Sequence, residues 1–213
     1  MCDPVGARGR LIVLEGGEGS GKSTQARLLA ERLGAELTRE PGGTEVGERV
    51  RAIVLDRSLG HLAPRAELLL MVAARAQHVA EVLRPALERG RDVVCDRFSG
   101  STLAYQAYGR GLPLEDVALA SEVATAGLAA DLVVLLDLPP EEARRRLAGV
   151  SDRIEAEDEA FHERVRAGFA ALAAADPRRW AVVDATGTRE EVATHVAGVV
   201  DGRLGPSRPR VAP

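Results

Sequence analysis

The sequence has 213 residues, of which 46% are hydrophobic and 28% are charged, which is enough to build the core of one ordinary α/β domain. Its formal net charge of −4 argues against sequence-independent nucleic-acid binding, and its two cysteines exclude a disulfide framework and a cysteine-based zinc site. Residues 1–10 contain no apolar signal segment, and no apolar run is long enough to cross a membrane. We therefore expect a cytoplasmic protein that binds neither nucleic acid nor membrane.

The first predicted elements are a buried strand and a helix, joined by a glycine-rich segment. Residues 11–14 form a short continuous apolar run, which is typical of a strand that is buried on both faces. Apolar residues recur at helical spacing over residues 22–33, and Gly34 is a suitable C-cap for that helix. The glycine-rich segment therefore lies where a strand ends and a helix begins.

Strands and helices continue to alternate along the rest of the chain. The remaining predicted elements are a helix over 65–83 that begins after Pro64, strands over 92–95, 132–136 and 181–183, and helices from about 141, over 159–174 and over 190–200. Pro85 is expected to kink or end the first of these helices. This alternation predicts a three-layer α/β/α fold with a five-stranded parallel sheet, in a single domain over residues 1–204. Residues 205–213, rich in proline and arginine, are expected to be a disordered tail.

The glycine-rich segment matches the pattern G-x-x-x-x-G-K-[ST] over residues 16–23, which is typical of P-loop NTPases. Glycines allow main-chain N–H groups to approach phosphate oxygens, and the following helix adds its positive N-terminal end. Lys22 is the only lysine among 28 cationic side chains, and a lysine here reaches the β- and γ-phosphates of a nucleotide. The residues expected to bind ATP are Gly16, Gly17, Glu18, Gly19, Ser20, Gly21, Lys22, Ser23 and Thr24.

Other features indicate which class of P-loop protein this is. A GTPase needs an Asn-Lys-x-Asp guanine-binding motif, which a chain with its only lysine in the P-loop does not have. Asp96 ends a predicted strand, where a carboxylate can act on Mg²⁺ together with Ser23, and Arg97 follows it. A cluster of arginines at 144–146 and Arg153 is typical of a lid, at about 146–153, that closes over the transferring phosphoryl group. These features predict a kinase that acts on a small acceptor.

Four further segments are distinctive: Thr-Arg-Glu-Pro-Gly-Gly-Thr at 38–44, Ala-Ala-Arg-Ala-Gln at 73–77, the Asp-Arg-Phe, Ser-Thr and Ala-Tyr-Gln groups within 96–106, and Asp-Arg-Ile-Glu at 152–155. They resemble segments of bacterial thymidylate kinases, which are P-loop nucleoside monophosphate kinases. The match runs in order from about Arg10 to Leu204. The resemblance implies phosphorylation of dTMP to dTDP, with ATP as the donor and Mg²⁺ as the cofactor, for dTTP synthesis. It also implies a homodimer.

The resemblance assigns roles to particular residues. The catalytic residues that it implies are Lys22, Glu18, Arg97, Arg146 and Arg153, and the metal site comprises Ser23, Glu18 and Asp96. The implied dTMP-binding residues are Arg39, Pro41, Met71, Arg75, Arg97, Ser101, Thr102, Tyr105 and Gln106. Among these, Arg97 would hold the 5′-phosphate of the acceptor, Arg75 would donate to a thymine carbonyl, and Tyr105 would disfavour a ribose 2′-OH.

The sequence departs from the family pattern at two positions. Met71 stands where the family usually has a phenylalanine that stacks on thymine, and Ala148 stands where related bacterial enzymes often have a lid arginine. A thioether selects base shape less strictly than an aromatic ring, so a kinase for another pyrimidine deoxynucleoside monophosphate, such as dUMP, is one alternative. A nucleotide-binding regulator without catalytic turnover is a second alternative.

Overall fold

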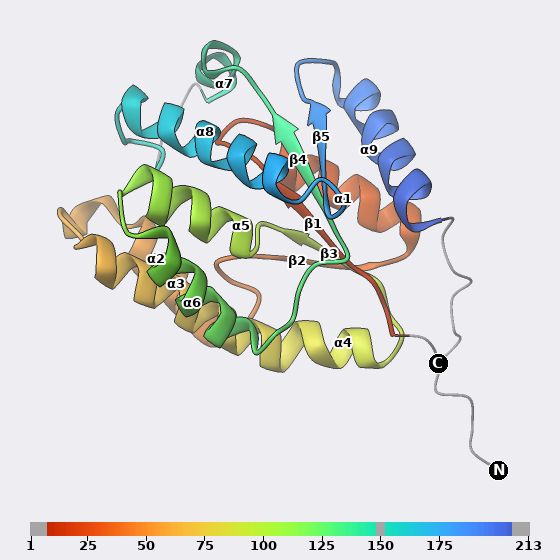
Figure 1. Ribbon diagram of the computed structural model, residues 1–213, viewed down its shortest axis with the longest axis horizontal. Coiled ribbons are helices and arrows are strands. Elements are labelled where there is room, and N and C mark those ends of the chain that lie inside the picture. The colour runs from red at the N-terminus through yellow and green to blue at the C-terminus, as the bar shows by residue number, and fades with distance from the viewer. Residues whose placement is uncertain (1–7, 148–151, 206–213) are drawn as a thin grey trace.

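A computed structural model describes residues 8–147 and 152–205. Its centre is a parallel sheet with the strand order β2-β3-β1-β4-β5 (Figure 1), which confirms the predicted five-stranded α/β fold. The strands are β1 (Leu11–Glu15), β2 (Glu36–Arg39), β3 (Val93–Asp96), β4 (Leu132–Asp137) and β5 (Trp180–Asp184).

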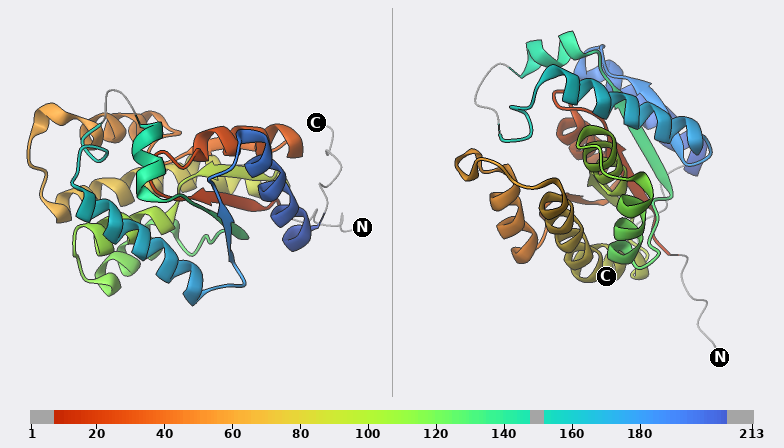
Figure 2. Two further views of the ribbon diagram at one scale, coloured as in Figure 1. Left: turned by 90° about the horizontal axis from the view of Figure 1, so that it is seen from above. Right: turned by 60° about the vertical axis from the view of Figure 1, so that its left-hand side comes forward.

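Side chains of β1 alternate between two hydrophobic layers, one on each face of the sheet. Ile12 and Leu14 pack with α1 (Lys22–Leu33) and α9 (Arg189–Leu204) on one face. Leu11 and Val13 pack on the other face with the π-helical turn η2 (Val79–Leu83) and with α4 (Arg84–Glu88). Leu135 of β4 adds α8 (Glu159–Ala175) to this second layer. Figure 2 gives two further views of these three layers.

The remaining helical elements surround the carboxyl ends of the strands or lie beside them. They are α2 (Glu45–Leu55), η1 (Arg57–Leu59), α3 (Pro64–His78), α5 (Ser99–Thr102), η3 (Leu103–Gly109), α6 (Leu114–Thr125) and α7 (Pro140–Arg146). Helices α2, α3 and α6 lie side by side (Figure 1). Within the described ranges, no helix combines the length and the apolar character needed to cross a membrane.

Two of the differences between the observed and the predicted elements have a clear physical reason. The predicted helix over 65–83 is α-helical only to His78, and a π-helical turn then leads into α4, which has Pro85 in its first turn. Proline has no N–H group to donate, so a regular α-helical ladder cannot continue through it. Strand β2 is the second difference, because its residues alternate between half-buried and exposed at the sheet edge and have no continuous apolar run.

The register of the sheet brings the candidate site residues to the carboxyl ends of neighbouring strands. Leu14 is paired with Asp96 across β1 and β3, and Arg39 is paired with Asp96 across β2 and β3. The segments that follow these three strands therefore leave the sheet at the same end, as expected for a ligand site in an open parallel sheet.

Candidate active site

The loop between β1 and α1 has the backbone conformation that a phosphate cradle requires. Gly16 has a φ of 147°, and a Cβ atom there would lie 2.5 Å from the carbonyl oxygen of Leu136. Gly21, with a φ of 84°, is the N-cap of α1. Helix α1 has no side-chain cap hydrogen bond and no acidic residue in its first turn, so its N-terminal N–H groups face the loop without an acidic cap.

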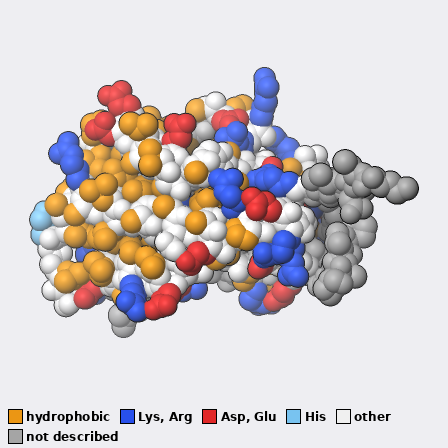
Figure 3. All heavy atoms as spheres, turned by 90° about the horizontal axis from the view of Figure 1, so that it is seen from below, with side chains coloured by type: hydrophobic (Ala, Val, Ile, Leu, Met, Phe, Trp, Pro, Cys, Tyr) orange, Lys and Arg blue, Asp and Glu red, His pale blue; other side chains and the backbone are white. Residues whose placement is uncertain are grey.

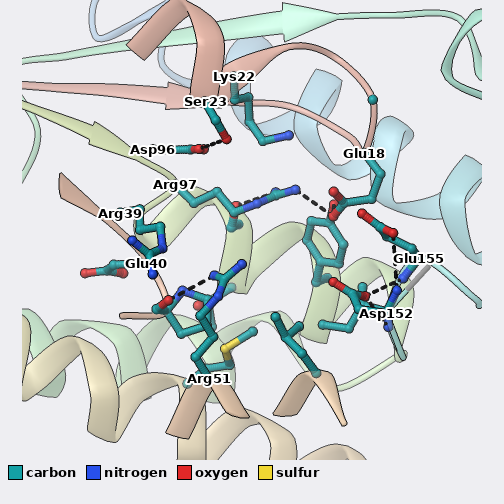
Figure 4. Close-up of a pocket in the computed structure, with 18 of the residues that line it drawn as sticks. Glu18, Lys22, Ser23, Arg39, Glu40, Arg51, Asp96, Arg97, Asp152 and Glu155 are labelled. Carbon is teal, nitrogen blue, oxygen red and sulfur yellow. Dashed lines mark hydrogen bonds and ion pairs between the residues drawn. The ribbon is translucent and has the colours of Figure 1, made fainter. Parts of the chain in front are cut away.

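Lys22 is folded back onto this loop. Its Nζ donates hydrogen bonds to the carbonyl oxygen of Gly17 at 2.6 Å and to Oγ of Ser20 at 3.3 Å. Burial and the nearby Arg97 lower the pKa of Lys22 to about 8, against the opposing effect of Glu18. The ammonium group is thus held by oxygen atoms of the loop itself. Figure 4 shows the Lys22 side chain in the same cavity as Arg97 and Glu18.

Asp96 and Ser23 form a pair beside the loop. Oγ of Ser23 donates to Oδ2 of Asp96 at 2.5 Å, and Figure 4 shows the two side chains pointing toward each other. The other carboxylate oxygen of Asp96 is buried and has no hydrogen-bond partner among the described residues. A buried oxygen of this kind, next to a hydroxyl group, suits a small divalent cation that brings its own water and phosphate ligands.

Arg97 and Glu18 connect the P-loop to the segment that follows β3. Arg97 donates to Oε1 of Glu18 at 2.6 Å, to the carbonyl oxygen of Gly16 at 3.0 Å and to Oγ of Ser101 at 3.1 Å. Its backbone has a φ of 71°, which is uncommon for a residue with a side chain and is typical of functional sites. The guanidinium also lies 5.0 Å from the ring centroid of Tyr105.

The carboxylate of Glu18 is strongly held in its ionised form. Burial alone would raise its pKa, but Arg97 and Lys22 outweigh burial, and Tyr105 donates a further hydrogen bond at 2.8 Å. Together they lower the pKa of Glu18 to about 2. Glu18 therefore accepts hydrogen bonds but does not move a proton near neutral pH.

Glu15, at the end of β1, stabilises the segment that follows β3. It is fully buried and accepts hydrogen bonds from the backbone N–H groups of Phe98 and Ser101 and from Oγ of Ser101 at 2.6 Å. Burial raises its pKa, although these hydrogen bonds and Arg97 oppose the rise. Glu15 therefore fixes the turn that carries Arg97.

A second network holds the segment after β2 against α3. Arg75, which is buried, donates to Oε2 of Glu40 at 2.7 Å and to Oγ1 of Thr102 at 2.8 Å. Nδ1 of His78 lies 2.8 Å from the other oxygen of Glu40, and Nε2 lies 2.7 Å from Oγ1 of Thr38. Glu40 thereby fixes the position of the Arg75 guanidinium, which borders the cavity described next.

These elements enclose a cavity of about 410 Å³. The residues expected from the sequence that line it are Glu18, Gly19, Gly21, Lys22, Ser23, Thr24, Arg39, Pro41, Met71, Arg75, Asp96, Arg97, Ser101, Thr102, Tyr105, Gln106 and Arg146. Gly16, Gly17 and Ser20 belong to the loop but not to the lining of this cavity.

The two candidate lid arginines have different surroundings. Arg146, at the end of α7, lines the cavity while it also donates to Glu142 and to the carbonyl oxygen of Thr186. Arg153 does not line the cavity, since it donates to Glu67 and, at 2.8 Å, to the carbonyl oxygen of Val54. Ala148 lies outside the described residues. The structure thus brings only Arg146 of this pair to the phosphate-binding side.

Arg51 is a cavity-lining cation that the sequence does not single out. It projects from α2, donates to the carbonyl oxygen of Pro41 at 3.0 Å and lies in the same cavity as Arg39 and Arg97 (Figure 4). Burial and Arg39 lower its pKa. A single arginine on an amphipathic helix is usually a solvated residue, so only the position of α2 identifies it. Leu55 of α2 also lines the cavity.

Comparisons with known proteins show the family to which this chain belongs. A family model described as thymidylate kinase matches residues 14–196. The chain is 50% identical over 197 residues to a thymidylate kinase of Pelotomaculum thermopropionicum, covering 89% of this chain and 90% of that protein. It is 50% identical over 212 residues to a thymidylate kinase of Leifsonia xyli subsp. xyli, covering 96% and 100%. A crystal structure of thymidylate kinase from Ehrlichia chaffeensis superposes with a TM-score of 0.77 at 31% identity, covering 91% of this chain and 99% of that one. The chain therefore belongs to the thymidylate kinase family.

Proposed function

We propose that this chain transfers the γ-phosphate of ATP to the 5′-phosphate of dTMP, giving ADP and dTDP. The observation that carries the proposal is that one cavity joins a P-loop to a set of cations and base-recognising side chains. In Figure 4, Arg97 lies between Lys22 on the P-loop side and Arg51 on α2. Family membership supports the same reaction.

On the donor side, the loop N–H groups and α1 would bind the β- and γ-phosphates, and Lys22 would leave Gly17 to contact them. Asp96 and Ser23 would hold Mg²⁺, and Glu18, which lines the same cavity, would contribute to the metal site. Phosphate oxygens and water would supply the remaining ligands of the cation. When bound, Mg²⁺ would neutralise charge on the phosphates.

On the acceptor side, Arg97 would bind the dTMP phosphate, with Arg39 and Arg51 nearby. A phosphate monoester is mostly ionised near neutral pH, so no strong general base is required. Glu18 therefore holds and orients Arg97 instead of removing a proton. Arg146 would contact the transferring phosphoryl group when the lid closes, which also excludes water as a competing acceptor. Arg153 would need to leave Glu67 to take such a role.

The base would lie against Met71, Pro41 and Leu55, with Arg75 donating to a carbonyl group of the pyrimidine. Thr102, Ser101 and Gln106 would complete the contacts of the base and the phosphate, and Tyr105 would pack against the sugar at its 2′ carbon.

A panel of acceptors tests this function against the two alternatives. ADP formation is measured with ATP and Mg²⁺ and with dTMP, dUMP, dCMP, ribose TMP or no acceptor. Fast turnover with dTMP and slow turnover with ribose TMP is the expected result. Equal turnover with dTMP and dUMP would favour the broader pyrimidine kinase, and ATP binding without turnover would favour the regulator. No structural or comparative observation favours either alternative.

We also propose that the protein is a homodimer that works in the cytoplasm. Exposed apolar side chains lie on the three adjacent helices α2, α3 and α6, and Figure 3 shows hydrophobic side chains gathered over one half of the side on which these helices lie. The residues are Val46, Ile53, Leu69, Leu114, Leu119 and Val123. Sedimentation equilibrium should give twice the chain mass for the wild type and the single chain mass for Leu119→Glu. A monomeric wild type would contradict the dimer.

A further inference from the structure

The amide nitrogen and the amide oxygen of Gln106 differ in their hydrogen bonding. Gln106 is fully buried on η3, and its Nε2 donates to Oε1 of Glu67 at 2.9 Å. Its Oε1 is buried and has no hydrogen-bond partner among the described residues. Gln106 also borders the acceptor cavity, so a ligand bound there could supply a partner for this oxygen.

Glu67 determines the orientation of the Gln106 amide group. Its carboxylate is 1% exposed and forms ion pairs with Arg110, at 3.1 Å, and with Arg153. Burial would raise the pKa of Glu67, but its hydrogen bonds with Arg110, Arg153 and Gln106 lower it. An ionised carboxylate only accepts hydrogen bonds, so the amide of Gln106 must turn its NH₂ group toward Glu67 and its oxygen away.

The orientation matters because Arg75 lies in the same wall of the cavity. Arg75 donates to Oγ1 of Thr102, which is one helical turn before Gln106. Glu67, Met71 and Arg75 recur every four residues along α3 and so share a face. The wall thus combines a fixed donor, the guanidinium of Arg75, with a fixed acceptor, Oε1 of Gln106.

We propose that Glu67 is a positioning residue that sets base specificity by fixing the amide of Gln106. A donor beside an acceptor matches the C4 carbonyl and N3–H of thymine and uracil, whereas cytosine presents an amino group and an unprotonated N3. With a free amide, Gln106 would turn its NH₂ group toward N3 of cytosine. Glu67 prevents that turn, so the wall rejects cytosine. This inference rests on the proposed function.

The test is the ratio of kcat/KM for dTMP to kcat/KM for dCMP. A glutamine at position 67 can donate to Oε1 of Gln106 and so permit the reversed amide. Glu67→Gln should therefore lower this ratio at least tenfold, because kcat/KM for dTMP falls while dCMP becomes a relatively better acceptor. Arg110→Gln is the matched control, since it removes an ion pair of Glu67 but keeps the carboxylate. Its ratio should stay within about twofold of the wild type, because a purely structural loss slows both acceptors equally.

The swapped pair Glu67→Gln with Gln106→Glu should restore the ratio. In this double variant, one oxygen of the carboxylate at position 106 would accept from the amide at position 67, and the other oxygen would accept from N3–H. If Glu67→Gln alone does not fold, the double variant can be tested instead, because the exchange keeps the net charge of the buried cluster. A ratio no better than that of Gln106→Ala would then overturn the inference.

The outcomes separate this inference from the proposed function. A wild type without dTMP-dependent turnover would refute the function itself. A wild type that prefers dTMP, together with a Glu67→Gln ratio equal to that of Arg110→Gln, would leave the function intact and overturn the role of Glu67.

Discussion

Arg97 and Glu18 form a 2.6 Å ion pair that links the segment after β3 to the P-loop. The arginine proposed to bind the acceptor phosphate is thereby held by the loop proposed to bind the donor. If the acceptor phosphate binds Arg97 as proposed, it would share that guanidinium with Glu18, and this sharing would couple the placement of the two substrates. The positive φ of Arg97 agrees with a side chain that the surrounding structure holds in place.

Glu18→Gln should slow catalysis without weakening the binding of dTMP. The change removes a negative charge beside the acceptor phosphate but loosens Arg97, so kcat should fall by about 10–100-fold while the Kd of dTMP stays equal or decreases. Steady-state kinetics and calorimetric titration with dTMP check this. A clear rise in the Kd of dTMP with an unchanged kcat would contradict this expectation.

Binding of ATP should take up a proton at alkaline pH. The pKa of Lys22 is about 8 in the free protein, so the amine is largely neutral at about pH 9. Phosphate next to it favours the charged form and raises the pKa, so the complex binds a proton that the free protein has lost. Titration calorimetry in buffers of different ionisation enthalpy measures this uptake.

The uptake should approach one proton at about pH 9 and be much smaller at about pH 7, where free Lys22 is already charged. Lys22→Arg is the control, because a guanidinium does not titrate in this range. Equal uptake by the two proteins would assign the proton to another group.

Replacing His78 should weaken both the fold and the recognition of the base. His78→Leu removes the buried partner of Oε1 of Glu40 and of Oγ1 of Thr38, which should cost about 2–4 kcal/mol in the free energy of unfolding. The KM for dTMP should rise as well, because Glu40 then holds Arg75 less firmly. Urea unfolding and kinetics at saturating ATP measure the two effects.

Arg27→Ala is a suitable comparison for the stability measurement. It removes an exposed ion pair with Glu31 and should change the free energy of unfolding by about 0.5 kcal/mol or less. If His78→Leu were as mild as this control, the buried network would not support the site.

The elements that could be predicted are those whose structure depends on residues adjacent in the chain. The P-loop and α1 depend on residues adjacent in the chain, and the predicted helix over 22–33 agrees with the observed bounds. Buried strands such as β3 and β4 are continuous apolar runs and are recognisable for that reason. Edge strand β2 is not, because only its neighbour β3 makes it a strand.

The side-chain partners within the site depend on tertiary packing and could not be read from the sequence. Arg153 and Arg146 look alike in sequence, yet Arg153 is bound to Glu67, 86 residues away, and only Arg146 reaches the cavity. Arg51 reaches the site because α2 packs beside α3. The partners of Gln106 likewise become visible only once η3 lies against α3.

Met71→Phe should improve selection of thymine. Met71 is half-buried, lines the cavity and lies one helical turn before Arg75. An aromatic ring at this place can stack on the base, a contact worth about 0.5–1.5 kcal/mol, so the KM for dTMP should fall by about 2–10-fold. Kinetics with dTMP and dUMP check this. An unchanged KM for both acceptors would indicate that residue 71 packs in the core and does not touch the base.

Transfer of the γ-phosphate to dTMP is tested most directly by following the phosphate itself. ATP labelled at the γ-phosphate is incubated with the protein, Mg²⁺ and dTMP, and the products are separated by chromatography. The predicted result is label in dTDP, little label in inorganic phosphate, and loss of transfer in both Lys22→Ala and Arg97→Gln. Label released as inorganic phosphate regardless of dTMP, or transfer that survives both substitutions, would contradict the proposed active site.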